Sequence, residues 1–130
     1  MRFLIIILIS LSQLLGQETN VQEIRLSGLI TDGNQEISGM DWYQDRLFLL
    51  PENLGGFLFV IPKIEILNSI QSNEKISITP KQTRFISPNY ENLINGFDGF
   101  EAIAFNGNKV FMSIEAEHNG KMNSYIVWGE

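Results

Sequence analysis

Carboxylate side chains recur near the ends of apolar runs in this 130-residue chain. Glu52 and Glu115 each follow such a run, and Glu101 begins one. Asp98 stands three residues before Glu101, on a loop-like segment where two carboxylates could share a metal ion. The same acids could instead cap strand ends and satisfy turn amides, as an aspartate does in an Asx-turn. The chemistry therefore depends on whether the fold brings these side chains together.

The residues needed for histidine-based, cysteine-based or serine-hydrolase chemistry are missing from this sequence. The chain has one histidine, His118, and no cysteine, so it offers neither a histidine cluster nor a disulfide framework. The segment 115–121 around His118 is expected as an exposed turn, where a histidine is a solvated side chain rather than a ligand. No G-x-S-x-G motif occurs, so a serine hydrolase of the α/β type has no support.

The first residues have the layout of a secretory signal peptide. Arg2 precedes an apolar stretch, residues 3–15, and Gly16 is a small residue at the expected cleavage point. A retained membrane anchor is the alternative, but a spanning helix needs about 20 apolar residues, and this stretch is shorter and interrupted by polar side chains. We therefore expect residues 1–16 to be removed, which leaves a secreted or periplasmic domain, 17–130, without a stable membrane anchor.

The charge balance is acidic, with 15 Asp and Glu against 9 Lys and Arg and a formal net charge of −6. Nucleic-acid binding needs clustered lysine and arginine to neutralise phosphates, and nothing in this sequence clusters them. We therefore expect no nucleic-acid partner. Ordinary solubility explains the acidity, and affinity for cations is the second interpretation.

Short apolar or alternating runs bounded by turn residues predict an all-β chain. Residues 63–70 are ambiguous, because their isoleucines suit strand alternation whereas Ile64, Leu67 and Ile70 suit a short amphipathic helix; we favour an outer strand. Residues 87–99, rich in Asn, Pro and Gly, are expected as a loop. The remaining expected strands are 21–30, 36–42, 46–50, 57–61, one or two within 71–86, 100–105, 109–114 and 123–128.

Two segments of the chain repeat one another. Residues 37–53, ISGMDWYQDRLFLLPEN, align with residues 100–116, FEAIAFNGNKVFMSIEA, at an offset of 63. Polar and turn positions are in phase as well: Asp45 with Asn108, Arg46 with Lys109, Glu52 with Glu115 and, at 64, Gly56 with Gly120. A repeat of consecutive antiparallel strands predicts the four-stranded blades of a β-propeller, each of which needs neighbours on both faces. Aromatic residues at equivalent places are expected in packing between blades rather than against a ligand: Trp42, Phe48, Phe105 and Phe111.

The length of the chain limits the number of blades. Known propellers use about four to eight blades, whereas this chain holds about two. We therefore expect the first blades of an incomplete β-propeller, as the front piece of a longer product. A small sandwich that closes on itself is the alternative.

The repeated segments resemble the opening blades of the phytase-like β-propeller family. This family is also called the esterase-like-activity-of-phytase family. The resemblance rests on Ser38-Gly39-Met40 and Glu52-Asn53 in the first copy, and on Glu101-Ala102-Ile103-Ala104 and Ser113-Ile114-Glu115 in the second. It covers residues 24–128, the front part of a normal member. Ala102 stands where members usually have glycine, and Pro51-Glu52 stands where they usually have Ser-Asp.

This resemblance implies hydrolysis of phosphate or other esters with calcium in complete members, and small-molecule esters as substrates. The ends of inner propeller strands face the central channel, and calcium takes six to eight oxygen ligands, so several blades must contribute. We expect Glu101, Glu115 and Asp98 as candidate metal ligands and Ser38 and Glu52 as polar channel residues. With so few ligands, the chain alone is not expected to be an active enzyme. The alternatives are a non-catalytic binding or scaffold module and a metal-dependent lactone hydrolase of the gluconolactonase type.

Overall fold

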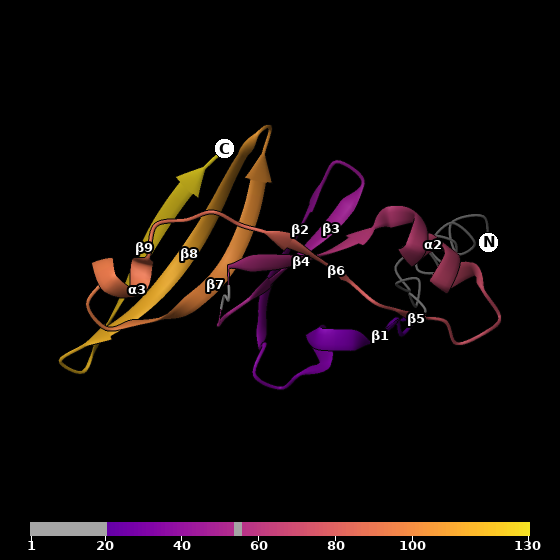
Figure 1. The fold of residues 1–130 in the computed structure, drawn as a ribbon, viewed down its shortest axis with the longest axis horizontal. Helices are drawn as coiled ribbons and strands as arrows, with labels where there is room; N and C mark the ends of the chain where they lie inside the picture. The colour runs from indigo at the N-terminus through magenta and orange to yellow at the C-terminus, as the bar shows by residue number, and fades with distance from the viewer. Residues whose placement is uncertain (1–20, 54–55) are drawn as a thin grey trace, which may run out of the picture.

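The computed structural model of the protein describes residues 21–53 and 56–130, and in this part the fold is predominantly β (Figure 1). The predicted signal peptide, 1–16, lies outside the described residues. One antiparallel sheet has the strand order β2-β3-β4-β6, and a second has the order β7-β8-β9. The strands of the first are β2 (Ile37–Tyr43), β3 (Arg46–Pro51), β4 (Phe57–Pro62) and β6 (Lys81–Arg84). Those of the second are β7 (Phe97–Asn106), β8 (Lys109–His118) and β9 (Lys121–Gly129).

Smaller elements complete the described part of the chain. Strands β1 (Arg25–Leu26) and β5 (Ser77–Ile78) pair in parallel as a two-stranded sheet. A 3-10 helix, η1 (Gly28–Thr31), follows β1, and a helix, α2 (Lys63–Gln71), connects β4 to the segment before β5. A short helix, α3 (Tyr90–Leu93), precedes β7. The prediction of an all-β chain built from antiparallel sheets is therefore confirmed in its coarse form, with a four-stranded and a three-stranded sheet rather than two sheets of four.

The sequence repeat is reproduced in the pairing of the strands. Met40 lies opposite Leu49 in the first hairpin, and Ile103 lies opposite Met112 in the second, so both partners shift by the predicted 63 residues. The irregularities agree as well, because the register shifts between Ile37 and Gly39 and again between Phe100 and Ala102. Two hairpins that share a register and the position of a bulge are equivalent structural units.

The two sheets pack face to face through the larger hydrophobic core. Phe48 lies opposite Val60, so the two project from the same face of the first sheet. Leu50 and Leu58 stand two residues along the same strands and belong to the same core cluster. The facing side chains of the second sheet are Phe100, Ile103, Met112 and Ile114. All eight are buried, and Leu50 and Ile114 have no exposed surface. This contact holds the inner strands β2 and β7 next to one another.

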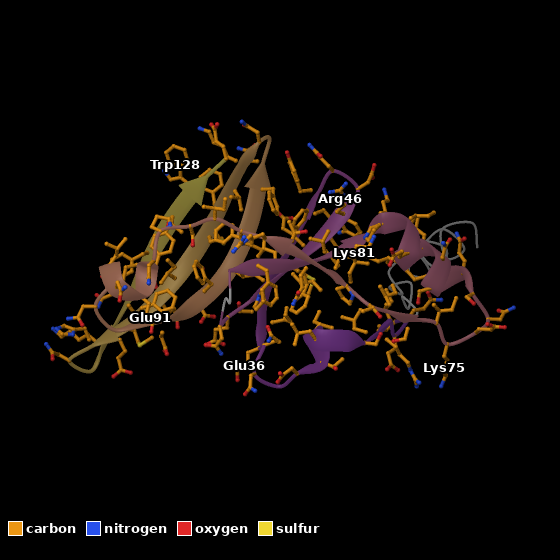
Figure 2. All side chains as sticks on the ribbon, in the orientation of Figure 1. Glu36, Arg46, Lys75, Lys81, Glu91 and Trp128 are labelled. Atoms are coloured by element: carbon orange, nitrogen blue, oxygen red, sulfur yellow. The ribbon has the colours of Figure 1, made fainter. Side chains whose placement is uncertain are left out.

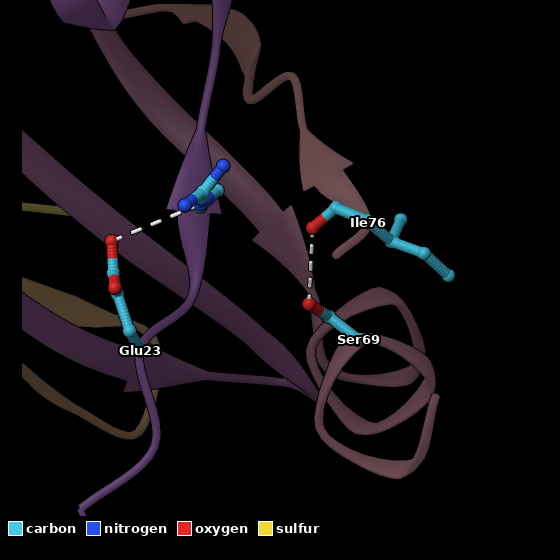
Figure 3. A network of polar contacts seen from close by, with 4 residues as sticks. Glu23, Ser69 and Ile76 are labelled. Carbon is cyan, nitrogen blue, oxygen red and sulfur yellow. Dashed lines mark hydrogen bonds and ion pairs between the residues drawn. The ribbon is translucent and has the colours of Figure 1, made fainter. Parts of the chain in front are cut away.

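The opposite face of the first sheet has its own cover. Leu49, Phe59 and Ile61 are buried there together with Ile78 of β5, and side chains from β1, η1 and α2 pack around them. Helix α2 is tied to the segment before β5 by the Ser69 hydroxyl, which donates to the carbonyl oxygen of Ile76 at 3.4 Å (Figure 3). The same view shows the exposed ion pair of Glu23 with Arg25, at 3.9 Å.

The predicted outer strand at 63–70 is wrong, because this segment is helix α2. Pro62 has extended backbone angles and ends β4, and Glu65 lies in the first helical turn, where a carboxylate interacts favourably with the helix dipole. Only Ile66 packs against the core below, whereas Ile64, at 60 % exposure, projects into solvent. Strand alternation had placed both isoleucines on one buried face.

The predicted strand 21–30 is also wrong in most of its length. Only Arg25–Leu26 forms a strand, and Gly28 has a φ of 81°, which turns the chain into η1. The expected turn 115–121 is shorter than predicted, because β8 continues to His118 and only Asn119 and Gly120 turn the chain, both with positive φ. The expected loop 87–99 contains α3 and the start of β7.

Candidate functional site: carboxylates at the bulges of the inner strands

Three of the predicted site residues occupy β-bulges. Ser38 is the extra residue in β2, between the pairs Ile37–Pro51 and Gly39–Leu50. Glu101 is its counterpart in β7, and Asp98 is the extra residue at a second register shift in that strand. A bulge bends its strand and redirects a side chain out of the regular alternation, and bulges are frequent next to active sites. The local backbone therefore directs three polar side chains that an ordinary strand would place differently.

Glu52 is brought to the same place by the backbone that follows β3. Its N–H donates to the carbonyl oxygen of Glu36 at 2.7 Å, and its own carbonyl oxygen accepts from the N–H of Phe100 at 3.3 Å. The first bond closes the hairpin of the first sheet, and the second joins that sheet to β7. Figure 2 shows the side chain of Glu36 beside the start of β2.

The side chain of Glu52 lies directly over Gly99. A Cβ atom added to Gly99 would be 2.6 Å from Cγ of Glu52 and 3.2 Å from its Oε1. Only glycine leaves room for the carboxylate arm at this position, so Gly99 is part of the site. The sequence marked the loop around this glycine but gave no reason to assign it a role, because the residue opposite it comes from the other repeat.

Like charges raise the pKa of two of these carboxyl groups. Desolvation raises the pKa of Glu101, and the negative charges of Glu115 and Asp98 raise it further. Desolvation also raises the pKa of Glu52, followed by the charges of Glu101, Glu36 and Asp98 and a side-chain hydrogen bond with Glu36. The predicted residues Glu52, Asp98, Glu101 and Glu115 thus lie within electrostatic reach of one another, and Glu36 joins them. We call these five residues the acidic cluster.

The acidic cluster is not balanced by a neighbouring cation among residues 21–53 and 56–130. The ion pairs in this part of the chain are Arg25 with Glu23 and Lys63 with Asp45, and neither includes a member of the cluster. Carboxylate oxygens are the donors that calcium prefers. Within the same residues, however, no three acid or histidine side chains converge closely enough to hold a metal ion. The donor chemistry fits calcium, but the geometry does not complete a site.

Ser38 links the two sheets through its hydroxyl group. Its Oγ lies 2.5 Å from the carbonyl oxygen of Phe100 and 3.3 Å from that of Leu50, and it donates its hydrogen to them. The residue is half-buried and sits beside the backbone that precedes Glu101. Ser38 therefore positions β7 against the first hairpin at the point where the acidic cluster begins.

Asp41 is a second link between the sheets, and the sequence reasoning missed it. Its Oδ2 accepts a hydrogen bond from the N–H of Phe105 at 2.7 Å, and its Oδ1 accepts from the N–H of Trp42 at 2.7 Å. The equivalent position in the second hairpin is Ala104. A charged residue in the middle of an apolar strand, at a place where the repeat has alanine, was the available signal.

The repeated aromatic residues divide between core and surface. Phe48 is buried, Phe105 is half-buried against the same core, and their ring centroids are 5.0 Å apart. Trp42 is 48 % exposed, so its prediction as a packing residue is wrong. Trp42 projects from the same face of the first sheet as Leu47 and Leu49. The segments β1, β5 and α2 cover this face only over β3 and β4, so the part over β2, where Trp42 lies, stays exposed. Phe111 is half-buried, and His118 is exposed as expected.

A cavity under the connection between the sheets is lined by none of the residues of the acidic cluster. It has a volume of about 540 Å³ and is lined by residues 84–91, the connection between the sheets, together with Gly56, Phe97 and Phe100. Apart from Arg84 and Glu91, its lining is uncharged. This cavity offers an aromatic surface under a connecting segment and none of the predicted metal ligands.

The comparisons with known proteins add no relative. No family model matches this sequence, and neither does any curated protein or solved structure. Among the residues that the structure describes, no helix has the length and apolar character needed to cross a membrane.

Proposed function

We propose that the chain forms the first blades of an exported phytase-like β-propeller, whose complete form hydrolyses phosphate or other esters with calcium. The observation that carries this proposal is the equivalence of the two bulges at Ser38 and Glu101. Equivalent bulges in neighbouring inner strands direct polar side chains to one place, which is what a channel formed by successive blades requires. The acidic cluster gathers beside these bulges.

Each carboxylate has a distinct part in this proposal. In the complete form, Glu101, Glu115 and Asp98 would hold a calcium ion through their carboxylate oxygens, and Glu52 would line the channel beside them from the preceding sheet. A calcium ion bound there supplies positive charge that neutralises a phosphate group and lowers the pKa of a bound water. The acidic cluster itself holds concentrated negative charge, which repels an anionic ester.

The same geometry supports binding without turnover by the chain alone. Calcium takes six to eight oxygen ligands, and three carboxylates at ligand distance do not occur in the described part of the chain. We expect weak calcium binding, with a dissociation constant of about 10⁻⁴ to 10⁻³ M, as in extracellular modules with incomplete ligand sets. Ester turnover requires ligands beyond those that the acidic cluster supplies.

Calorimetric titration with calcium tests the proposal. Glu101→Gln keeps the size of the side chain and removes its charge, so the heat of calcium binding should fall to the level of a buffer blank. Glu65→Gln is the matched control, because Glu65 lies on α2, outside the acidic cluster, and its titration should match that of the unchanged chain. Calcium binding that is absent from the unchanged chain, or that survives Glu101→Gln, would remove the basis of the proposal.

A second candidate function is a non-catalytic binding module. The observation that favours it is the exposure of large apolar side chains on both sheets, including Met40 at 64 % and Trp128 at 63 %. Single exposed apolar residues are ordinary, but groups of them mark contact surfaces. Because the chain alone is not expected to turn over esters, the assay that separates the two functions uses a full-length relative with a complete propeller. Release of phosphate from a small aryl phosphate in the presence of calcium, abolished by a chelator, would favour the enzyme over the binding module.

A further inference from the structure

The outer edge of the second sheet differs from that of the first in its side chains. In the first sheet, β6 forms the edge and carries Lys81 and Arg84, and all four of its residues are exposed. Charged side chains on an edge strand prevent pairing with another chain. In the second sheet, β9 forms the edge, and no charged residue occurs between Lys121 and Glu130. The first edge is protected, and among residues 21–53 and 56–130 no strand pairs with the outer side of the second.

The first sheet shows how such a further strand would pair. Phe48 lies opposite Val60 of β4, and the equivalent Phe111 lies opposite Trp128 of β9, so β9 occupies the position of β4. β4 pairs on its other side with the antiparallel strand β6. The segment of β9 equivalent to the paired part of β4, residues 125–128, forms the edge of its sheet in the described part of the chain.

The side chains of β9 are apolar and accessible where that strand would lie. Ile126 is 76 % exposed and Trp128 is 63 % exposed, and Figure 2 shows Trp128 at the outer margin of the second sheet. The Nζ of Lys109 lies 5.0 Å from the centre of the Trp128 ring, which holds that ring on the sheet surface. A long apolar edge of this kind is a site for strand addition.

We propose that β9 of this 130-residue chain pairs antiparallel with β9 of a second copy. The β9 of the second copy then takes the place that β6 has in the first sheet, a place that in a complete propeller belongs to a strand of the same chain, and two three-stranded sheets become one sheet of six. A two-fold axis perpendicular to the sheet relates the copies, so Ile126 and Trp128 of both copies lie on one face and form a continuous apolar strip. The antiparallel arrangement also places the Lys121 end of each strand at the Glu130 end of the other. Because each copy uses the same edge, the assembly closes as a dimer and does not extend.

Sedimentation or light scattering of the full chain over about a hundredfold range of concentration tests this proposal. The mass should rise from that of one chain, 14.8 kDa, to twice that value. Ile126→Lys places a charge in the centre of the edge and should leave a monomer. Ile64→Lys is the control, because Ile64 is also 60 % exposed but lies on α2, at the far end of the molecule in Figure 1, and this variant should dimerise normally.

Hydrogen exchange of the unchanged chain tests the same pairing without a variant. Pairing protects backbone amides of residues 125–128, so their exchange should slow as the concentration rises, while exchange in β6 stays constant. A chain that remains monomeric throughout, or a dimer in which β9 exchanges at the monomer rate, overturns the proposal. Association through the face of the sheet or through the N-terminal residues would give the second result.

Discussion

Gly39 lies at a close approach of the two inner strands, and its replacement by alanine tests the packing of the sheets. A Cβ atom at this position would lie 3.0 Å from Cα of Ala102 and 3.0 Å from the backbone nitrogen of Ile103. Favourable contacts between heavy atoms begin at about 3.5 Å. Both neighbours are backbone atoms of β7, which is paired with β8, so neither can move aside by a rotation of a side chain.

The size of the effect follows from what must shift. β7 has to retreat from β2 by several tenths of an ångström, which strains the bonds of Ser38 and Asp41 across the sheets. Overpacking of this kind costs about 1–3 kcal/mol. For a chain of this size, each kcal/mol lowers the melting temperature by roughly 3–6 °C, so a decrease of about 3–18 °C is expected.

Urea denaturation followed by circular dichroism measures the change in the free energy of unfolding. Gly33→Ala is the matched control, because a Cβ atom there meets nothing within 4 Å and no positive φ opposes it. The control should be neutral or more stable by about 0.4–1 kcal/mol, since alanine restricts the unfolded chain. If both variants have the same stability, the two inner strands do not touch in the way described and the sheet contact is wrong.

Two further predictions concern the polar groups between the sheets. Asp41→Ala leaves the Phe105 N–H without its acceptor and should lower the free energy of unfolding by about 1–3 kcal/mol. Asp41→Asn keeps an oxygen at that place, so it should lower the free energy of unfolding by less. Urea denaturation of both variants measures the difference. Glu52 and Glu101 have raised pKa values, so the folded chain holds protons more tightly than the unfolded chain, and stability should decrease as the pH rises above 4.5 towards neutrality. Glu101→Gln should flatten this decrease and raise stability at neutral pH by about 0.2–1 kcal/mol in thermal melts, and an unchanged pH profile would show that the cluster does not repel itself.

The hairpins of both sheets could be predicted from the sequence because each repeats one pattern of apolar, turn and charged residues. The offset was fixed by the matching turn residues, Asp45 and Asn108, and by the matching charged residues that follow them. The strand registers agree with this offset. Local pattern and tertiary pairing point to the same structure in these segments, which is why simple reasoning was sufficient. Glu52 and Glu115 followed from the same offset.

The rest depended on contacts between segments that are distant in the sequence. Helix α2 and a strand were both compatible with the isoleucines of 63–70, and the face of the first sheet decided between them by accepting only Ile66. Gly99 acquired its role from the Glu52 side chain of the other repeat. Asp41 acquired its role from a backbone amide 64 residues away. A periodic pattern contains none of this information, because each depends on which surface lies opposite.

Equivalent positions in the two hairpins therefore share a backbone but not an environment. Phe48 is buried because the second sheet covers its face, whereas the equivalent Phe111 is half-buried. Val60 is 6 % exposed and its counterpart Trp128 is 63 % exposed. The repeat encodes the same register and the same bulge in each unit, and the neighbouring surface then decides which apolar side chains become core. The apolar face that carries Phe111 and Trp128 has consequently no covering sheet in the described part of the chain, and Ile126 and Trp128 on it stay exposed.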